Sequence, residues 1–213
     1  MILSGIFIFS QEDSGYLILE YDILFQDGRQ HKLEVVLSEK MTYELTHTGM
    51  IERGYMIDLG FDRYYTIMTA KGRRNVFQKG LAKDRLGFIA KDPADYTITE
   101  QSETIDLLGY NFVRYEIATT GGEQIIAYTN CDFNDVKIDL NLRYTQLPGL
   151  PGKIITDKSV QTLVSIQKVS TLPEDLLDGK MWTREQMDNL SLSTTGMTFD
   201  ELERENRRRF KGQ

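Results

Sequence analysis

Cysteine, histidine and proline are scarce in this chain, and long apolar runs are absent. The 213 residues include one cysteine, two histidines and four prolines. A single cysteine excludes an intramolecular disulfide, and two histidines exclude a zinc site built on three of them. No apolar run reaches the roughly 18 residues that a membrane-spanning helix needs, so the sequence predicts no transmembrane segment.

The short motifs that mark common catalytic sites are also missing. The sequence contains no G-x-x-x-x-G-K-[ST], G-x-G-x-x-G, H-E-x-x-H or G-x-S-x-G, which removes the usual signatures of nucleotide binding, metalloprotease chemistry and serine hydrolysis. We therefore predict a protein that is not an enzyme and has no cofactor, no metal ion and no catalytic residues.

The charge balance is acidic. The formal net charge is −7, with 40% hydrophobic and 27% charged residues. This composition is typical of a soluble globular protein, and the negative charge argues against binding to nucleic acid or to an anionic membrane surface. A chain of this size buries about 70% of its unfolded surface, so it can build a core without disulfides.

Alternating apolar residues are the strongest structural signal. Residues 15–26 alternate, the Asp27-Gly28 dipeptide follows, and residues 31–37 alternate again. This pattern predicts a β-hairpin with one buried face and a type I′ turn, in which both central residues need positive φ. His31 falls on the apolar side, where we expect a packed residue and not a ligand.

Further short strands are separated by frequent turn signals. They are predicted at residues 43–48, 54–59, 63–70, 74–78, 96–100, 104–108, 112–118, 124–129 and 161–169. Residues 81–90 fit neither the alternating pattern of a strand nor the 3.6-residue period of a helix clearly. Such a series predicts a mostly β fold with an antiparallel sheet, sandwich or barrel.

The two ends differ from the middle, so we divide the chain into 1–10, 11–180 and 181–213. Residues 1–10 are apolar up to a small residue, which fits either a signal-peptide remnant or a first strand. Residues 11–180 form the antiparallel β domain. Residues 181–213 form a helical or extended tail, because Thr183 with Gln186 and Thr198 with Glu201 fit capping boxes. Residues 191–213 are expected to be exposed, frayed or docked on a partner.

Three segments, in order, resemble a known family. LLGYNFVRY at 107–115 is similar to its I-L-G-Y-x-C-x-K-A strand, IAYT at 126–129 to its A-W-Y-T strand, and LPGLPGKI at 147–154 to its G-L-P-G-L-I motif. The chain thus resembles the GLPGLI family and related bacterial envelope proteins of unknown function. It departs from the pattern at Gln146, which replaces the first glycine, at Pro151-Gly152, and at Phe112, where cysteine is common.

The resemblance implies an exported protein of an outer-membrane bacterium, in the periplasm or associated with the outer membrane. It also implies a fold like that of the lipoprotein carriers LolA and LolB: a curved antiparallel sheet, or open half-barrel, with a hydrophobic inner face and here a short helical C-terminal tail. No catalytic residue is carried over from the family.

The Pro-Gly motif has a physical interpretation of its own. Prolines remove backbone donors and glycines permit sharp reversals, so we expect a rigid loop or sheet edge and not a central strand. A fold-defining turn is favoured, and the rim of a binding site is the alternative. The residues predicted to contact a ligand or partner are Pro148, Gly149, Leu150, Pro151, Tyr110, Phe112 and Tyr128.

Three weaker signals are interpreted as structural. We expect Cys131 to be a small buried residue. Asp132, Asn134, Asp135 and Asp139 crowd one loop, but they lack the spacing of a calcium site. The basic groups at 71–74 and 207–209 are expected to be solvated surface, with lipid headgroup or partner contact as the alternative.

These observations lead to two functional hypotheses. The first is a non-catalytic envelope protein that binds a hydrophobic ligand, such as a lipid, an acyl chain or an apolar peptide, on a concave sheet. The alternative is an interaction subunit of an outer-membrane or periplasmic protein assembly that docks on its partner through the C-terminal tail.

Overall fold

A computed structural model describes residues 15–49, 51–133, 136–172, 179–198 and 201 of the chain. Their strands join into a single twelve-stranded sheet of order β12-β6-β5-β4-β3-β2-β1-β11-β10-β9-β8-β7. The strands are β1 (Tyr16–Phe25), β2 (Gln30–Ser38), β3 (Met41–Thr48), β4 (Ile51–Asp58), β5 (Arg63–Ala70), β6 (Arg73–Gly80), β7 (Tyr96–Leu107), β8 (Tyr110–Thr119), β9 (Gln124–Asn130), β10 (Leu150–Ile155), β11 (Ser159–Val169) and β12 (Lys180–Trp182). The helices are α1 (Ala82–Ile89), α2 (Asp139–Arg143) and α3 (Arg184–Thr195), with short 3-10 turns η1 (Pro93–Asp95) and η2 (Cys131–Phe133).

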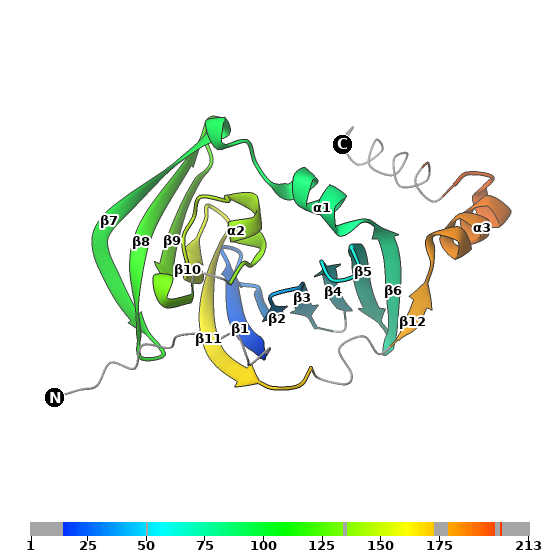
Figure 1. Ribbon diagram of the computed structural model, residues 1–213, viewed down its shortest axis with the longest axis horizontal. Coiled ribbons are helices and arrows are strands. Elements are labelled where there is room, and N and C mark those ends of the chain that lie inside the picture. The colour runs from blue at the N-terminus through cyan, green and yellow to red at the C-terminus, as the bar shows by residue number, and fades with distance from the viewer. Residues whose placement is uncertain (1–14, 50, 134–135, 173–178, 199–200, 202–213) are drawn as a thin grey trace.

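The sheet is curved but unclosed. It curls around α1 and α2, which lie on its concave side, and ends at the edge strands β7 and β12 (Figure 1). The predicted fold class, a mostly β curved antiparallel sheet with a short helical C-terminal element, is confirmed. One pairing departs from it, because β12 runs parallel to β6. Within the described residues, no helix is long and apolar enough to cross a membrane.

The first predicted hairpin is present, but its turn is not type I′. Gly28 has φ +83°, whereas Asp27 is not among the residues with positive φ. The N–H of Phe25 donates to the carbonyl of Arg29 over 2.9 Å, so three residues form the loop and Gly28 takes its left-handed position. Asp27 instead accepts hydrogen bonds from the backbone and side chain of Arg29.

The turns with two positive φ values lie elsewhere. Lys71-Gly72 joins β5 to β6 with φ values of +54° and +71°, and Leu108-Gly109 joins β7 to β8 with +55° and +80°. Leu108 was predicted as a strand residue, and it is the turn residue instead. The two short strands predicted at 96–100 and 104–108 are one long strand, β7, with a register shift between Glu100 and Thr104.

The expectation that the Pro-Gly motif avoids a central strand is wrong. Pro151 lies in β10, which is hydrogen-bonded between β9 and β11. The ladder with β9 shifts register between Pro151 and Lys153. A bulge tolerates proline because the ladder is interrupted there. The Pro151 carbonyl is also satisfied, because the buried hydroxyl of Tyr21 donates to it over 2.7 Å.

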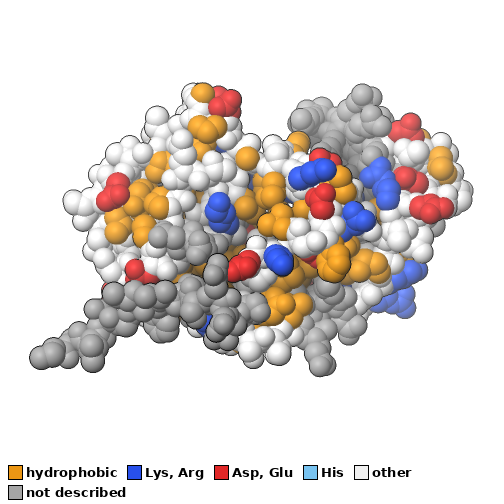
Figure 2. All heavy atoms as spheres, in the orientation of Figure 1, with side chains coloured by type: hydrophobic (Ala, Val, Ile, Leu, Met, Phe, Trp, Pro, Cys, Tyr) orange, Lys and Arg blue, Asp and Glu red, His pale blue; other side chains and the backbone are white. Residues whose placement is uncertain are grey.

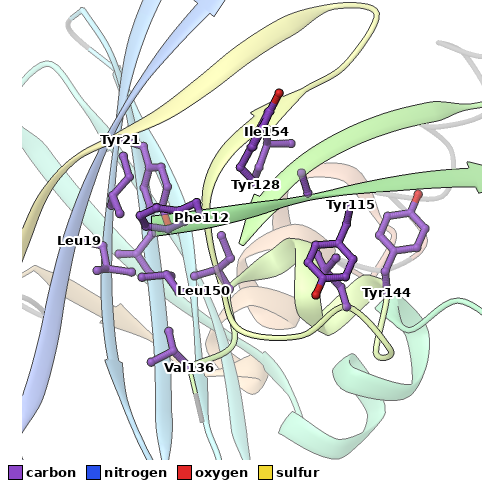
Figure 3. Packing of buried hydrophobic residues seen from close by; sticks show 14 of the residues in the cluster. Leu19, Tyr21, Phe112, Tyr115, Tyr128, Val136, Tyr144, Leu150 and Ile154 are labelled. Carbon is purple, nitrogen blue, oxygen red and sulfur yellow. The ribbon is translucent and has the colours of Figure 1, made fainter. Parts of the chain in front are cut away.

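The main core fills the concave side of β7–β11, β1 and β2. Figure 3 shows Tyr21, Phe112 and Leu150 side by side at one end of this cluster, and Tyr115 and Tyr144 at the other. A second cluster lies on the opposite face of β2–β6 and comprises Val36, Tyr43, Leu45, Met56, Ile67 and Val76. Consecutive residues such as Val35 and Val36 are both fully buried, so the sheet is covered on both faces there.

Other expectations have mixed outcomes. Residues 81–90, which the pattern left open, form helix α1. Cys131 is exposed and not buried, because it begins the turn η2 where the chain leaves β9. His31 is half-buried with its ring edge-on to Phe25 at 4.8 Å, as expected of a packed residue.

The loop that follows η2 is only partly described. Asn134 and Asp135 lie outside the described residues, as do residues 1–10 and 207–209. Among the residues that are described, no group of three or more potential metal ligands occurs.

The C-terminal region begins as predicted. Thr183 and Gln186 make both hydrogen bonds of a capping box at the start of α3, and Thr198 and Glu201 make the same pair of bonds further on. Met187 of α3 is buried. The division at residues 180/181 stays a prediction.

Candidate functional site

One row of side chains crosses seven strands on the concave face. Strand pairing places each member directly opposite the next. We call it the central row; in order across the sheet it comprises Leu19, Val35, Glu44, Tyr55, Thr66, Phe77 and Trp182. Opposed residues in a sheet lie within side-chain contact distance, so this row is a continuous track from the core to the β12 edge.

Burial changes along the central row. Leu19 and Val35 are fully buried, whereas Tyr55, Phe77 and Trp182 are half-buried. The half of the concave face built on β7–β11, β1 and β2 is therefore filled by the protein's own side chains. Among the described residues of the central row, the partly exposed aromatic side chains lie on β4, β6 and β12, so this half of the concave face is the one that a ligand can reach.

Glu44 lies where these two halves meet. Its Oε1 accepts a hydrogen bond of 2.7 Å from the backbone N–H of Asp139, the first residue of α2. The residue before the helix supplies no side-chain cap, so Glu44 satisfies a helix-end donor that would otherwise be unpaired. Burial, followed by the nearby charge of Asp139, raises the pKa of Glu44 from 4.5 to about 7.

Tyr55 follows Glu44 in the row. Burial raises the pKa of its hydroxyl, the charges of Glu44 and Asp139 raise it further, and the charge of Arg85 opposes the rise. The hydroxyl lies beside the Glu44 carboxyl, yet it makes no hydrogen bond of normal geometry within the described part of the chain. The Tyr55 ring is 6.4 Å from that of Tyr64, centroid to centroid.

Arg85 approaches this point from above the sheet, because α1 lies over β4 and β5. Its guanidinium carbon is 4.9 Å from the centroid of the Tyr64 ring and 5.7 Å from that of Phe88. The Nε atom is buried and lacks a hydrogen-bond partner among the residues described. Such placement over aromatic faces is favourable for a cation but leaves its donors unused.

The reachable half of the concave face carries an apolar strip, which we define as Tyr64, Met68, Phe77 and Trp182. The rings of Phe77 and Trp182 are stacked, with centroids 6.4 Å apart and planes inclined by 19°. The indole N–H of Trp182 donates to Asn75 over 3.0 Å, which holds the ring in place. Figure 2 shows hydrophobic side chains interspersed with charged side chains of both signs over the half of the molecule that carries α1 and β3–β6.

The structure gathers most of the sequence-predicted site residues inside the core. Gly149, Leu150, Pro151, Phe112 and Tyr128 are buried, and Pro148 and Tyr110 are half-buried. The Phe112 ring lies against Gly152, and the Tyr110 ring is edge-on to Phe133 at 5.3 Å. A role of these residues in ligand contact stays a prediction, and their burial supports the favoured interpretation of the motif as a structural element.

Sequence reasoning missed the residues that face the open half. Glu44 stands between the apolar residues Tyr43 and Leu45. If only one face of the strand is buried, this pattern predicts that the Glu44 side chain faces solvent. Arg85 lies in the segment of unclear period. Trp182, the only tryptophan, was assigned to the tail. The one signal that could have identified it as a site residue was its position as a large aromatic side chain beside a capping box.

Comparisons with known proteins concern the fold alone. No protein-family model and no curated protein matches the chain. Two solved structures of PNGF-II have a TM-score of 0.51 at 15% and 16% sequence identity, and the match covers 79% and 80% of this chain but 31% of that one. The chain thus spans about a third of the length of PNGF-II.

Two further structures match less well. A crystal structure of MucB has a TM-score of 0.39 at 12% identity, covering 78% of this chain and 58% of that chain. A LolA-superfamily protein from Nitrosomonas europaea has a TM-score of 0.21 at 11% identity, covering 78% of this chain and 90% of that chain. Because no family model matches, the resemblance to the GLPGLI family rests on the three sequence segments.

Proposed function

We propose that this chain is a non-catalytic binding protein that holds an apolar chain, such as an acyl chain, on the apolar strip of its concave face. The observation that supports the proposal is the central row, which is sealed in the core at Leu19 and Val35 and half-exposed at Phe77 and Trp182. An apolar chain bound along the strip would extend the buried apolar contacts of the core toward the β12 edge.

The strip offers partly exposed apolar side chains on both sides of Thr66. Met68 is 41% exposed on β5, and Phe88 on the facing helix is 76% exposed. Removing apolar surface from water stabilises a complex by roughly 25 cal/mol per Å², and aromatic side chains supply large area at little conformational cost. Partly exposed aromatics on a concave face are typical of small-molecule sites.

Location in the bacterial envelope belongs to the same proposal. It rests on the three segments that resemble the GLPGLI family and on the apolar start of the chain. An acyl chain or lipid is a ligand that an envelope protein encounters, so the two parts of the proposal agree.

Trp182 makes the proposal directly testable, since it is the only tryptophan and belongs to the strip. Titration with 1-dodecanol, an uncharged chain, is expected to give a saturable change in tryptophan emission. Met68→Glu should weaken binding strongly, because it places a charge in the strip. Val164→Glu is the matched control, since Val164 is also 41% exposed but lies on β11. No saturable response in the native chain, or equal loss in both variants, would refute the proposal.

A further inference from the structure

Arg85 stands at the inner end of the apolar strip with unused hydrogen-bonding capacity. Its guanidinium lies over the Tyr64 ring at 4.9 Å, and its buried Nε has no hydrogen-bond partner within the described residues. A guanidinium is always charged and presents a planar fork of donors suited to a carboxylate. The Arg85 side chain is partly removed from water, and no ion pair to it occurs among the described residues.

Tyr55 adds a second unused donor at the same place. Its hydroxyl is buried without a partner in the part of the chain that is described, and its ring is 6.4 Å from Tyr64. The Tyr64 ring lies 6.4 Å from the Tyr55 ring, centroid to centroid, and 4.9 Å from the Arg85 guanidinium carbon, so both groups lie beside one ring. Buried donors are normally satisfied. Among the described residues the Arg85 Nε has no acceptor, and the Tyr55 hydroxyl has only the Glu44 carboxyl beside it.

Each acidic group nearby already has one carboxyl oxygen in a hydrogen bond or ion pair. Glu44 accepts from the backbone of Asp139 over 2.7 Å, and the Asp139 carboxylate pairs with Arg143 over 3.0 Å. These are the two acidic residues whose charges act on Tyr55. Because Glu44 is buried, it is largely uncharged below neutral pH and does not repel an arriving anion.

We propose that the ligand of the strip is a long-chain carboxylate, whose alkyl chain lies on Tyr64, Met68, Phe77 and Trp182 and whose carboxylate binds Arg85. The carboxylate forms a charge-assisted pair with the guanidinium and accepts a further hydrogen bond from Tyr55. This inference rests on the proposed function, because it names the headgroup of the same apolar chain.

Lys180 and Arg53 are further cations beside the strip, and they define the alternative orientation. Lys180 holds its ammonium 3.8 Å from the centroid of the Trp182 ring, at the β12 edge, and Arg53 is paired opposite Met68. Both are exposed, so water competes for their hydrogen bonds and an ion pair there adds little. Arg85 is the partly desolvated cation, which is where a carboxylate gains most.

The experiment compares dodecanoate with 1-dodecanol at about pH 6, using the emission of Trp182 in the full chain. The native chain is expected to bind the carboxylate at least tenfold more tightly, a difference of about 1.4 kcal/mol. Arg85→Gln should abolish this preference, so that dodecanoate binds no more tightly than 1-dodecanol to the same variant. Arg85→Lys should keep part of it, and Tyr55→Phe should reduce it.

Lys180→Gln and Arg53→Gln are the comparison variants, and both should retain the preference. Chemical denaturation of each variant verifies that it is folded. Equal affinity for the two ligands, or a preference that survives Arg85→Gln, overturns the inference and leaves the proposed function standing. A preference lost in Lys180→Gln or Arg53→Gln also overturns it, because the headgroup then lies at the rim. If neither ligand binds, the proposed function itself fails.

Discussion

The ring of Phe112 lies directly against the backbone of Gly152, in the space where any other residue would place its first side-chain carbon. These are two of the positions at which the chain departs from the G-L-P-G-L-I family pattern. The structure joins them: the large residue on β8 fills the gap that the glycine leaves in β10. Fully buried Phe112 is thereby seated beside the bulge that accommodates Pro151.

Gly152→Ala is expected to destabilise the fold, because the added methyl overlaps the Phe112 ring. Overpacking of this kind costs about 1–3 kcal/mol. Phe112→Leu in the same background should recover part of the loss, so a double-mutant cycle in urea should give a coupling energy above about 0.5 kcal/mol. Gly121→Ala is the control, since a side-chain carbon there meets only the Thr119 hydroxyl oxygen, at 3.8 Å. Additive effects of the two substitutions would contradict the contact.

Gly149→Ala should cost more than Gly122→Ala. Both glycines have positive φ, +64° and +84°, and a residue with a side chain there loses roughly 1–2 kcal/mol. Gly149 also packs against the backbone of Asn130, whereas Gly122 faces open space. Asn141 donates to the Gly149 carbonyl over 2.9 Å, so movement of this loop breaks a buried hydrogen bond as well. Equal unfolding free energies for the two variants would show that conformation alone matters.

The sequence predicted most of the strands, because period-two alternation and turn residues report directly on one buried face. The prediction that the glycines of the motif permit sharp reversals holds for Gly149, which has φ +64°, whereas Gly152 lies within β10 without positive φ. The central position of Pro151 was hidden, since a bulge depends on the register of β9 and not on the local pattern. The turn at Lys71-Gly72 lies between two predicted strands. The turn at Leu108-Gly109 was missed, because Leu108 was assigned to a strand and leucine seldom adopts positive φ.

The candidate site was less accessible to sequence reasoning for a related reason. Its members come from β3, β4, β5, β6, α1 and β12, and only the pairing of these strands brings Glu44, Tyr55 and Trp182 into one row. A buried carboxyl and a solvated one look the same in an alternating pattern. The difference arises from the helices that cover the concave face.

Glu44 gives the fold a measurable pH dependence. Burial raises its pKa from 4.5 to about 7, so the folded state holds this proton more tightly than the unfolded chain. The contribution of this proton to the free energy of unfolding is complete below about pH 4.5 and is lost as pH rises through 7. The total loss is about 3 kcal/mol. Glu44→Gln removes this loss, because an amide oxygen can still accept from the Asp139 N–H.

Denaturant unfolding of the native chain and of Glu44→Gln at several pH values tests this point. The variant should gain stability relative to the native chain between about pH 5 and 8. Glu103 is expected to show the opposite pH dependence of stability, because hydrogen bonds from Tyr128 and then Arg114 lower its pKa. The difference between Glu103→Gln and the native chain should therefore change only below about pH 4.5. A constant offset for Glu44→Gln across the whole range would contradict the assignment.

Met187 connects the C-terminal helix to the strip. It is 2% exposed on α3, whose first residue follows Trp182 by two positions, and α3 packs against β6. Met187→Ala should destabilise the chain by about 2–5 kcal/mol and weaken dodecanol binding, because β12 is a three-residue edge strand held from one side by β6. Leu192→Ala is the control on the same helix, since Leu192 is 46% exposed. If Met187→Ala leaves the Trp182 emission and the binding curve unchanged, then α3 does not support the site, and the helix is free to serve a partner as the tail hypothesis requires.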